Sequence, residues 1–225
     1  MFLKTGCEII LCAGSEPLRA DRITIDCQEL IQALSPGARV LMNDGAVELA
    51  VLEKAAEGAR CKVIRGGVLE GRKGVNAPGV ALDLPPLMDK DRADLDCMAA
   101  AGFDSVALSF VRDAGSVRAV RDYLNSRKYR LHLVAKIERA EALDNLEEIL
   151  DAAGSVLVAR GDLGVEIGLE HVPAAQKRVL KLAAALGRES ITSTQILESM
   201  RNIPVPTRAE VSDIYNAGLD GTGWR

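Results

Sequence analysis

The sequence has no long uninterrupted hydrophobic run. A Lys, Arg, Asp or Glu interrupts every apolar stretch before it reaches the roughly 18 to 20 residues that a membrane helix needs. The opening residues, Met1 to Gly6, also lack the basic and then apolar order of a secretion signal. We therefore expect a cytoplasmic protein that has no membrane partner.

Paired cysteines are absent as well. Structural disulfides and cysteine metal sites depend on paired spacings, and this chain has no Cys-x-x-Cys pair. Its cysteines are odd in number and mostly have apolar neighbours; they are Cys7, Cys12, Cys27, Cys61 and Cys97. We expect buried, reduced thiols rather than a redox or metal centre.

A strong excess of one charge is the third absence. The 225 residues carry a formal net charge of -4, with 48% hydrophobic and 27% charged residues. Disordered chains combine low hydrophobicity with high net charge, and proteins that coat nucleic acid are strongly basic. The composition therefore indicates a globular protein of one large domain or two smaller ones, without a nucleic-acid partner.

The first 80 residues are short β-prone runs separated by turn residues, a pattern typical of a small antiparallel β-domain. The runs are 8–12, 23–26, 40–42, 47–52 and 61–64. Asn43-Asp44-Gly45 predicts a hairpin between two of them, because an Asp-Gly pair tolerates the positive φ angles of a tight turn. Glycines and prolines then crowd the stretch 66–86, so we place the domains at 1–80 and 81–225.

From Asp89 onward, helical and strand patterns alternate, which indicates βα units and a parallel sheet or barrel. The expected helices are 89–101, 114–127, 140–152, 171–187 and 207–218, and the expected strands are 105–110, 131–137, 155–159 and 190–194. A closed (β/α)₈ barrel requires eight strands. The sequence thus predicts an α/β fold: a partial (β/α)₈ TIM barrel, preceded by a small antiparallel β-barrel domain at the N-terminal end.

Charged residues end one of these strands. Lys136 and Glu138 follow Leu131–Ala135, and alternation along the strand sends both side chains to one side while Ile137 faces the other. At the carboxyl end of a barrel strand, that side is the mouth of the active site. A solvated Lys-x-Glu pair is the structural alternative.

The next two strands end in a similar way. Gly161 and Asp162 follow Val156–Ala159, and Thr194 ends the strand after it. Two carboxylates on adjacent strand ends can share Mg²⁺ or Mn²⁺, while a glycine lets a ligand approach the backbone. An aspartate that caps a turn and a structural threonine are the alternatives, and the series of three strand ends favours a site.

Together these motifs resemble consecutive signatures of the pyruvate kinase family, in the order and spacing of that family. The motifs that carry the resemblance are 136–138, 159–166, 194–200 and 206–213. Asn43-Asp44-Gly45 and the stretch 73–79 are similar to the lid domain of that family and to its return to the barrel. The resemblance covers nearly the whole chain.

The resemblance implies phosphoryl transfer between phosphoenolpyruvate and ADP, giving pyruvate and ATP. It makes Glu138 and Asp162 the ligands of Mg²⁺ or Mn²⁺, and Lys136 the catalytic cation that stabilises the transferring phosphoryl group and the enolate. Gly161 and Thr194 would hold the substrate with Lys136. Lys73, or its neighbour Arg72, would contact the nucleotide.

Some parts of the family pattern are missing. By the resemblance, three leading barrel strands and one trailing strand are absent. The leading strands would carry an arginine and the site of a K⁺ ion. The regulatory C-terminal domain of the family is absent as well. We expect a homo-oligomer, or association through open barrel edges, and little turnover from the chain alone. Two alternatives stay open: an inactive truncated fragment, and a magnesium-dependent lyase or aldolase that handles pyruvate enolates.

Overall fold

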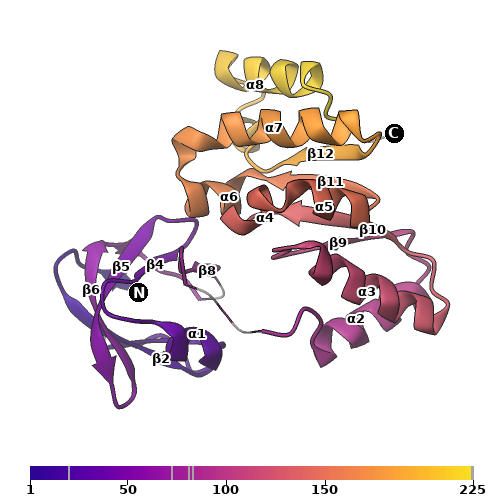
Figure 1. The fold of residues 1–225 in the computed structure, drawn as a ribbon. Helices are drawn as coiled ribbons and strands as arrows, with labels where there is room; N and C mark the ends of the chain where they lie inside the picture. The colour runs from indigo at the N-terminus through magenta and orange to yellow at the C-terminus, as the bar shows by residue number, and fades with distance from the viewer. Residues whose placement is uncertain (20, 72, 81, 83, 224–225) are drawn as a thin grey trace. The chain divides into compact units, whose positions relative to one another are not determined.

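A computed structural model describes residues 1–19, 21–71, 73–80, 82 and 84–223. The chain divides into two compact units, Met1–Leu84 and Pro85–Arg225 (Figure 1). No helix in these described ranges combines the length and the apolar character that crossing a membrane requires.

The first unit is built mainly from β-strands. Its elements are β1 (Phe2–Leu3), β2 (Glu8–Ala13), β3 (Arg22–Ile25), α1 (Gln28–Ala33), β4 (Arg39–Met42), β5 (Val47–Ala55), β6 (Gly58–Arg65), β7 (Gly67–Val68) and β8 (Val75–Asn76). Six strands form one sheet in the order β3-β2-β6-β5-β4-β8, and β1 pairs with β7. Buried aliphatic side chains at alternate positions of the strands, such as Leu11, Val40 and Leu49, form the core of this unit.

The hairpin that the sequence predicts joins β4 to β5. Met42 pairs with Val47, and Asn43, Asp44 and Gly45 all have positive φ angles between them. The expectation of a purely antiparallel sheet is wrong at one pair, because β2 and β3 run parallel. The connection after β2 carries the chain back to the start of that strand, so β3 begins beside it. Closure of this sheet into a barrel remains a prediction.

The second unit contains a four-stranded parallel sheet in the order β12-β11-β10-β9. Its strands are β9 (Ser105–Leu108), β10 (His132–Ile137), β11 (Ser155–Ala159) and β12 (Glu189–Ser193). Neighbours in the sheet are also neighbours in the sequence, as in a (β/α) barrel, and the four strands are half of the eight that closure requires.

Helices connect the strands of this sheet (Figure 1). They are α2 (Asp89–Ala100), α3 (Ala114–Arg127), α4 (Ala140–Asp144), α5 (Leu146–Ala152), α6 (Arg160–Ile167), α7 (Val172–Ala185) and α8 (Arg208–Leu219), with short 3₁₀ turns at Leu169–His171 and Glu198–Arg201. α3 packs on β10 and α7 packs on β11 and β12, while α5 contacts both of these helices. Buried residues such as Leu133, Ile137 and Val158 fill the space between helices and strands, and full burial of one such side chain contributes about 1.5 to 3 kcal/mol.

Two helical details differ from the sequence expectation. The helix expected over 140–152 is split at Asn145, whose side-chain amide donates to the carbonyl of Arg112 at 2.9 Å. The segment after β11, expected as a strand end followed by a loop, is the helix α6. Asp162 therefore lies in the first turn of a helix.

Candidate active site at the carboxyl ends of the parallel strands

The parallel register brings the ends of β9, β10, β11 and β12 to one edge of the sheet. Ile137 is opposite Val158, and Ala159 is opposite Ser193, so each sequence motif includes the last paired residue of its strand or directly follows it. Residues directly after these strands therefore lie along the same end of the sheet. Enzymes with (β/α) barrels build their active sites at this end of the strands.

Lys136 and Glu138 meet at the end of β10. The Lys136 ammonium contacts Glu138 Oε1 and donates to Ser109 Oγ at 3.0 Å. Glu138 Oε2 accepts from the backbone N–H of Phe110 at 2.7 Å. The contact confirms that Lys136 and Glu138 share a side of the strand, as alternation predicts, and it adds the end of β9 to the cluster.

Burial of the Glu138 carboxylate requires nearby groups that compensate its charge. Glu138 is only 2% exposed, whereas a quarter of the Lys136 side chain, 25%, remains exposed. A buried carboxylate is tolerated when opposite charge and hydrogen-bond donors replace its lost water, and Lys136 and the Phe110 N–H supply both. The arrangement holds a cation and an anion together at the edge of the sheet.

Gly161 and Asp162 occupy the first turn of α6, directly after β11. The backbone N–H of Gly161 donates to Thr194 Oγ1 at 3.0 Å. A negative side chain is favoured in the first turn of a helix, where backbone N–H groups are unpaired. The structure thus brings together Gly161 and Thr194, which the sequence placed on successive strand ends.

Thr194 lies in a strained part of the backbone. Its φ angle is +70°, and Gln195 and Leu197 also have positive φ angles of +53° and +55°. A β-branched residue with positive φ is uncommon, and such outliers cluster at functional sites. The outlier supports a functional interpretation of the Thr194 hydroxyl.

Arg160 holds this strained segment in place. Its guanidinium donates to the Thr194 carbonyl from Nη2 at 2.7 Å and from Nε at 3.2 Å, and to the Gln195 carbonyl at 3.3 Å. Nη1 donates to both carboxylate oxygens of Asp213 on α8, at 2.7 and 2.8 Å. One side chain therefore links the start of α6, the end of β12 and α8.

Sequence reasoning assigned no role to Ser109, Phe110 or Arg160. Ser109 lies near the carboxyl end of the expected strand 105–110, so the strand-end rule that found Glu138 would also have found it. The contribution of Phe110 is a backbone N–H at a φ of +55°, and the sequence carries no clear signal for it. Arg160 sits between a strand end and Gly161, which is a positional signal.

The donor chemistry at this edge fits a hard divalent cation. Mg²⁺ prefers oxygen ligands and commonly uses one or two carboxylates, with water and substrate oxygens completing its shell. Glu138 and Asp162 follow adjacent parallel strands at the same edge. Among the residues that the structure describes, no three His, Cys, Asp or Glu side chains form a cluster.

Lys73 belongs to the first unit. Its ammonium lies 3.6 Å from the Glu70 carboxylate, and 40% of its side chain is exposed. The alternative nucleotide contact, Arg72, falls outside the described residues. The role of Lys73 remains a prediction.

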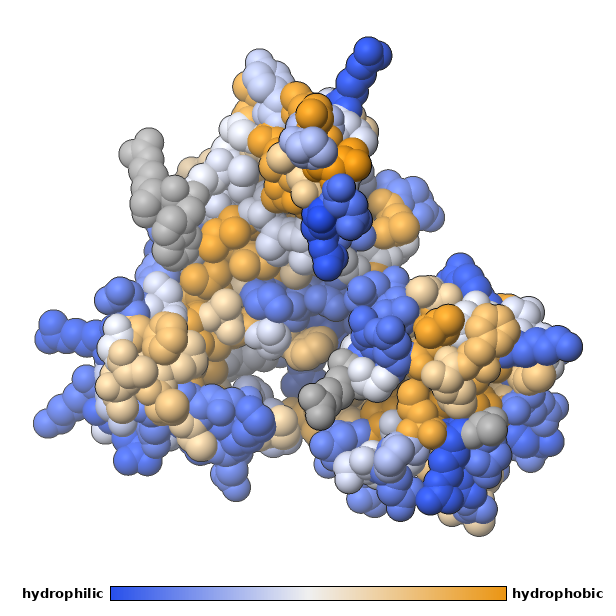
Figure 2. Space-filling model, turned by 180° about the vertical axis from the view of Figure 1, so that it is seen from behind, coloured by the Kyte–Doolittle hydropathy of each residue, from blue (hydrophilic) through white to orange (hydrophobic). Residues whose placement is uncertain are grey.

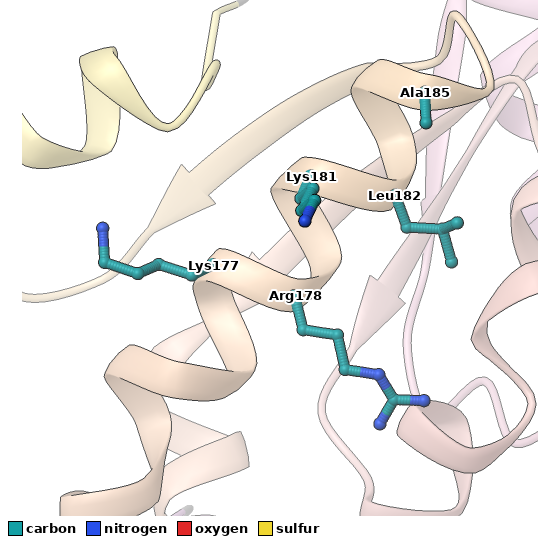
Figure 3. Close-up of a pocket in the computed structure, with 5 residues that line it drawn as sticks. All are labelled: Lys177, Arg178, Lys181, Leu182 and Ala185. Carbon is teal, nitrogen blue, oxygen red and sulfur yellow. The ribbon is translucent and has the colours of Figure 1, made fainter.

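A shallow hollow on the surface of α7 contains none of the strand-end residues described above. It is lined by residues of this one helix, Lys177, Arg178, Lys181, Leu182 and Ala185 (Figure 3). Lys177 is already paired with Asp220 at 2.7 Å. All of its lining residues come from one helix, and one of its lysines is already paired, so no polar groups from different elements of the described chain point into it. We therefore do not propose it as the functional site.

Comparison with known proteins gives a consistent result. The chain is 43% identical over 223 residues to a pyruvate kinase of Geobacillus stearothermophilus, covering 98% of this chain and 38% of that protein. It is 41% identical over 222 residues to a pyruvate kinase of Clostridium perfringens, covering 98% and 47%. It is also 41% identical over 219 residues to a pyruvate kinase of Methylorubrum extorquens, covering 97% and 45%.

The chain spans less than half of the length of each of these relatives. The family model described as "Pyruvate kinase, barrel domain" matches residues 1–224. Because this match covers nearly every residue, the chain belongs to the pyruvate kinase family.

Proposed function

We propose that the second unit carries the part of a pyruvate kinase active site that binds phosphoenolpyruvate and magnesium. The observation that carries the proposal is the contact of Lys136 with Glu138 and Ser109 at the carboxyl end of the sheet. It places a fixed ammonium beside a buried carboxylate where a barrel enzyme performs its chemistry. Family membership and the pair of Gly161 and Thr194 support the same reaction.

The proposed reaction is phosphoryl transfer from phosphoenolpyruvate to ADP. The bond between phosphorus and the enol oxygen breaks, and a terminal oxygen of ADP forms the new bond to phosphorus, giving ATP. The enolate carbon then takes a proton and becomes the methyl group of pyruvate. Catalysis of such transfers is mainly positioning and neutralisation of charge.

Each residue has a role in this proposal. Lys136 stabilises the negative charge on the transferring group and on the enolate oxygen, as a preorganised cation does. The backbone at Gly161 and the hydroxyl of Thr194 orient the substrate. Glu138 and Asp162 are the protein ligands of Mg²⁺ or Mn²⁺, and the bound ion would supply neutralisation of phosphoryl charge.

The remaining parts of the proposal follow from the family. We propose that the first unit acts as a lid. Its residue Lys73 contacts the nucleotide. A K⁺ ion belongs to the reaction of the family, and no residue of this chain is assigned to it. The protein acts in the cytoplasm on these small molecules, without a nucleic-acid or membrane partner.

The test is a titration with Mn²⁺ followed by the relaxation of water protons. We expect Glu138→Gln and Asp162→Asn each to weaken Mn²⁺ binding on the order of tenfold or more, because each removes half of the charge of the protein ligands. Phosphoenolpyruvate should tighten Mn²⁺ binding to the parent chain, and Lys136→Met should abolish that tightening. Glu147→Gln, which alters an exposed carboxylate on α5, is the matched control. Identical curves for all five proteins would refute the proposal.

A further inference from the structure

A buried ion pair lies between α6 and the residue that follows Glu138. The Glu166 side chain, in the last turn of α6, is only 2% exposed, and its Oε1 lies 3.6 Å from Arg139 Nη1. That oxygen has no hydrogen-bond partner within the described part of the chain. Its charge is therefore balanced by Arg139 at close range rather than by water.

Arg139 is itself fixed by a second carboxylate. It is the residue before α4, and its guanidinium donates to both oxygens of Glu141, from Nε at 3.2 Å and from Nη2 at 3.1 Å. The Arg139 side chain is 12% exposed. The guanidinium is planar, and two of its nitrogens are bound to Glu141. The orientation of the third nitrogen, Nη1, toward Glu166 is therefore fixed.

The groups around the Glu166 carboxyl group come from α4 and its start. Burial raises the pKa of Glu166, while the Arg139 charge and a hydrogen bond from the Ala140 backbone favour the carboxylate, and Glu141 opposes it. A carboxylate that has lost its water is strongly destabilised when its only opposite charge is removed. The pair is therefore sensitive to any displacement of α6 from the end of β10.

We propose that Arg139 and Glu166 are positioning residues that fix the first turn of α6, and with it Asp162 and Gly161, relative to Glu138. This inference rests on the proposed function for the role of those three residues. Arg139 directly follows Glu138, and Glu166 is four residues from Asp162 on the same short helix. The pair therefore links the segments that carry the two proposed metal ligands, while neither residue of the pair is itself a proposed ligand.

α6 needs such an anchor because it is short. A helix of eight residues is not stable by itself in water, so its position depends on tertiary contacts. Leu163, which is fully buried, holds one side of the helix in the core. Arg160 and the Gly161 N–H attach its first turn to the end of β12. The contact of Glu166 with Arg139 attaches its last turn to the end of β10.

A pair that only stabilises the fold would behave differently from one that positions α6. The experiment therefore compares Glu166→Gln, Arg139→Gln and the double variant with Asp220→Asn, which breaks the 2.7 Å pair with Lys177 elsewhere in the same unit. Amide hydrogen exchange, measured without metal, reports on residues 159–167, and a Mn²⁺ titration reports on the site.

For each single variant we expect exchange in residues 159–167 to become about tenfold faster, the effect of losing a contact to a charged group. Mn²⁺ affinity should fall about tenfold, as when groups that support metal ligands are removed. The double variant should be no weaker than Arg139→Gln alone, because the two residues act through one contact. Asp220→Asn should change neither quantity.

Exchange in residues 159–167 that changes no more than in Asp220→Asn would overturn the inference, as would additive losses of Mn²⁺ affinity. Uniformly faster exchange across the second unit would show a purely stabilising pair and would also overturn it. If the parent chain fails to bind Mn²⁺, the proposed function fails. Locally faster exchange would then still establish that the pair positions α6.

Discussion

Thr194 shows how a single residue combines strain with a proposed role. A side chain with a Cβ in the left-handed region costs roughly 1 to 2 kcal/mol, and Thr194 has a φ of +70° there. The donors of Arg160 to the Thr194 and Gln195 carbonyls compensate for part of this cost. A residue kept in a costly conformation is expected to be retained for its hydroxyl group.

This account predicts a difference between two substitutions of Thr194. Thr194→Gly should have an unfolding free energy about 1 kcal/mol greater than that of Thr194→Ala, because glycine adopts positive φ without steric cost. Both should lose the tightening of Mn²⁺ binding by phosphoenolpyruvate, since both lack the hydroxyl. Urea unfolding and the Mn²⁺ titration measure the two quantities. Equal stabilities would show that the backbone at Thr194 is not strained.

At the scale of elements, the Glu210 carboxylate organises the connection between β12 and α8. It accepts from the backbone N–H groups of Ser199 and Thr207, each at 2.7 Å, and from the hydroxyl groups of the same two residues. In return, the Thr207 hydroxyl accepts from the Glu210 N–H at 3.2 Å, which completes a capping box for α8. The turn and the helix therefore depend on one ionised group.

The hydrogen bonds from the Ser199 side chain, the Ser199 backbone and the Thr207 backbone lower the pKa of Glu210 from 4.5 to about 2. A carboxyl group with a lowered pKa in the folded state stabilises that state above its ordinary pKa, and the contribution is lost as pH falls toward the folded value. We expect the amide signals of Ser199 and Thr207 to shift as pH falls from 4.5 toward 2 in NMR spectra. In Glu210→Gln these shifts should be absent. Equal pH-dependent shifts of the Ser199 and Thr207 amides in that variant would count against the assignment.

Local signals explain which elements could be predicted from the sequence. The hairpin at Asn43–Gly45 was predictable because positive φ depends on the turn residues themselves. α6 was not, because Gly161 and Gly164 lower helix propensity, while the burial of Leu163 that favours the helix is a tertiary effect. At the site, Lys136 and Glu138 followed from strand alternation. The Phe110 N–H depends on backbone placement that no sequence pattern records, and Arg160 is indicated only by its position directly after a strand.

At the scale of the whole molecule, the parallel sheet has open edges. Within the described residues, β9 has no partner beyond β10, and the outer side of β12 has only an isolated bridge between Ser190 and Gly223. Figure 2 shows hydrophobic side chains at the α8 end of the second unit, at the top of that view. The exposed apolar residues of α8 are Val211, Ile214, Tyr215 and Leu219.

Open strand edges and exposed apolar surface favour association between chains. We predict that the 225-residue chain forms oligomers whose mass rises with concentration, measured by light scattering after gel filtration. Ile214→Glu, which places a charge on the exposed face of α8, should shift the distribution toward the monomer. A monomer at all concentrations, with no effect of Ile214→Glu, would be the contrary result.

The most direct test of the central claim is the location of the bound metal. In crystals of the chain grown with Mn²⁺, anomalous scattering identifies the position of the ion. The account predicts one manganese peak bonded to carboxylate oxygens of both Glu138 and Asp162, at about 2.1 Å from each, and no peak at that position in Asp162→Asn. A manganese ion held by other residues, or an unchanged peak in Asp162→Asn, would contradict the account.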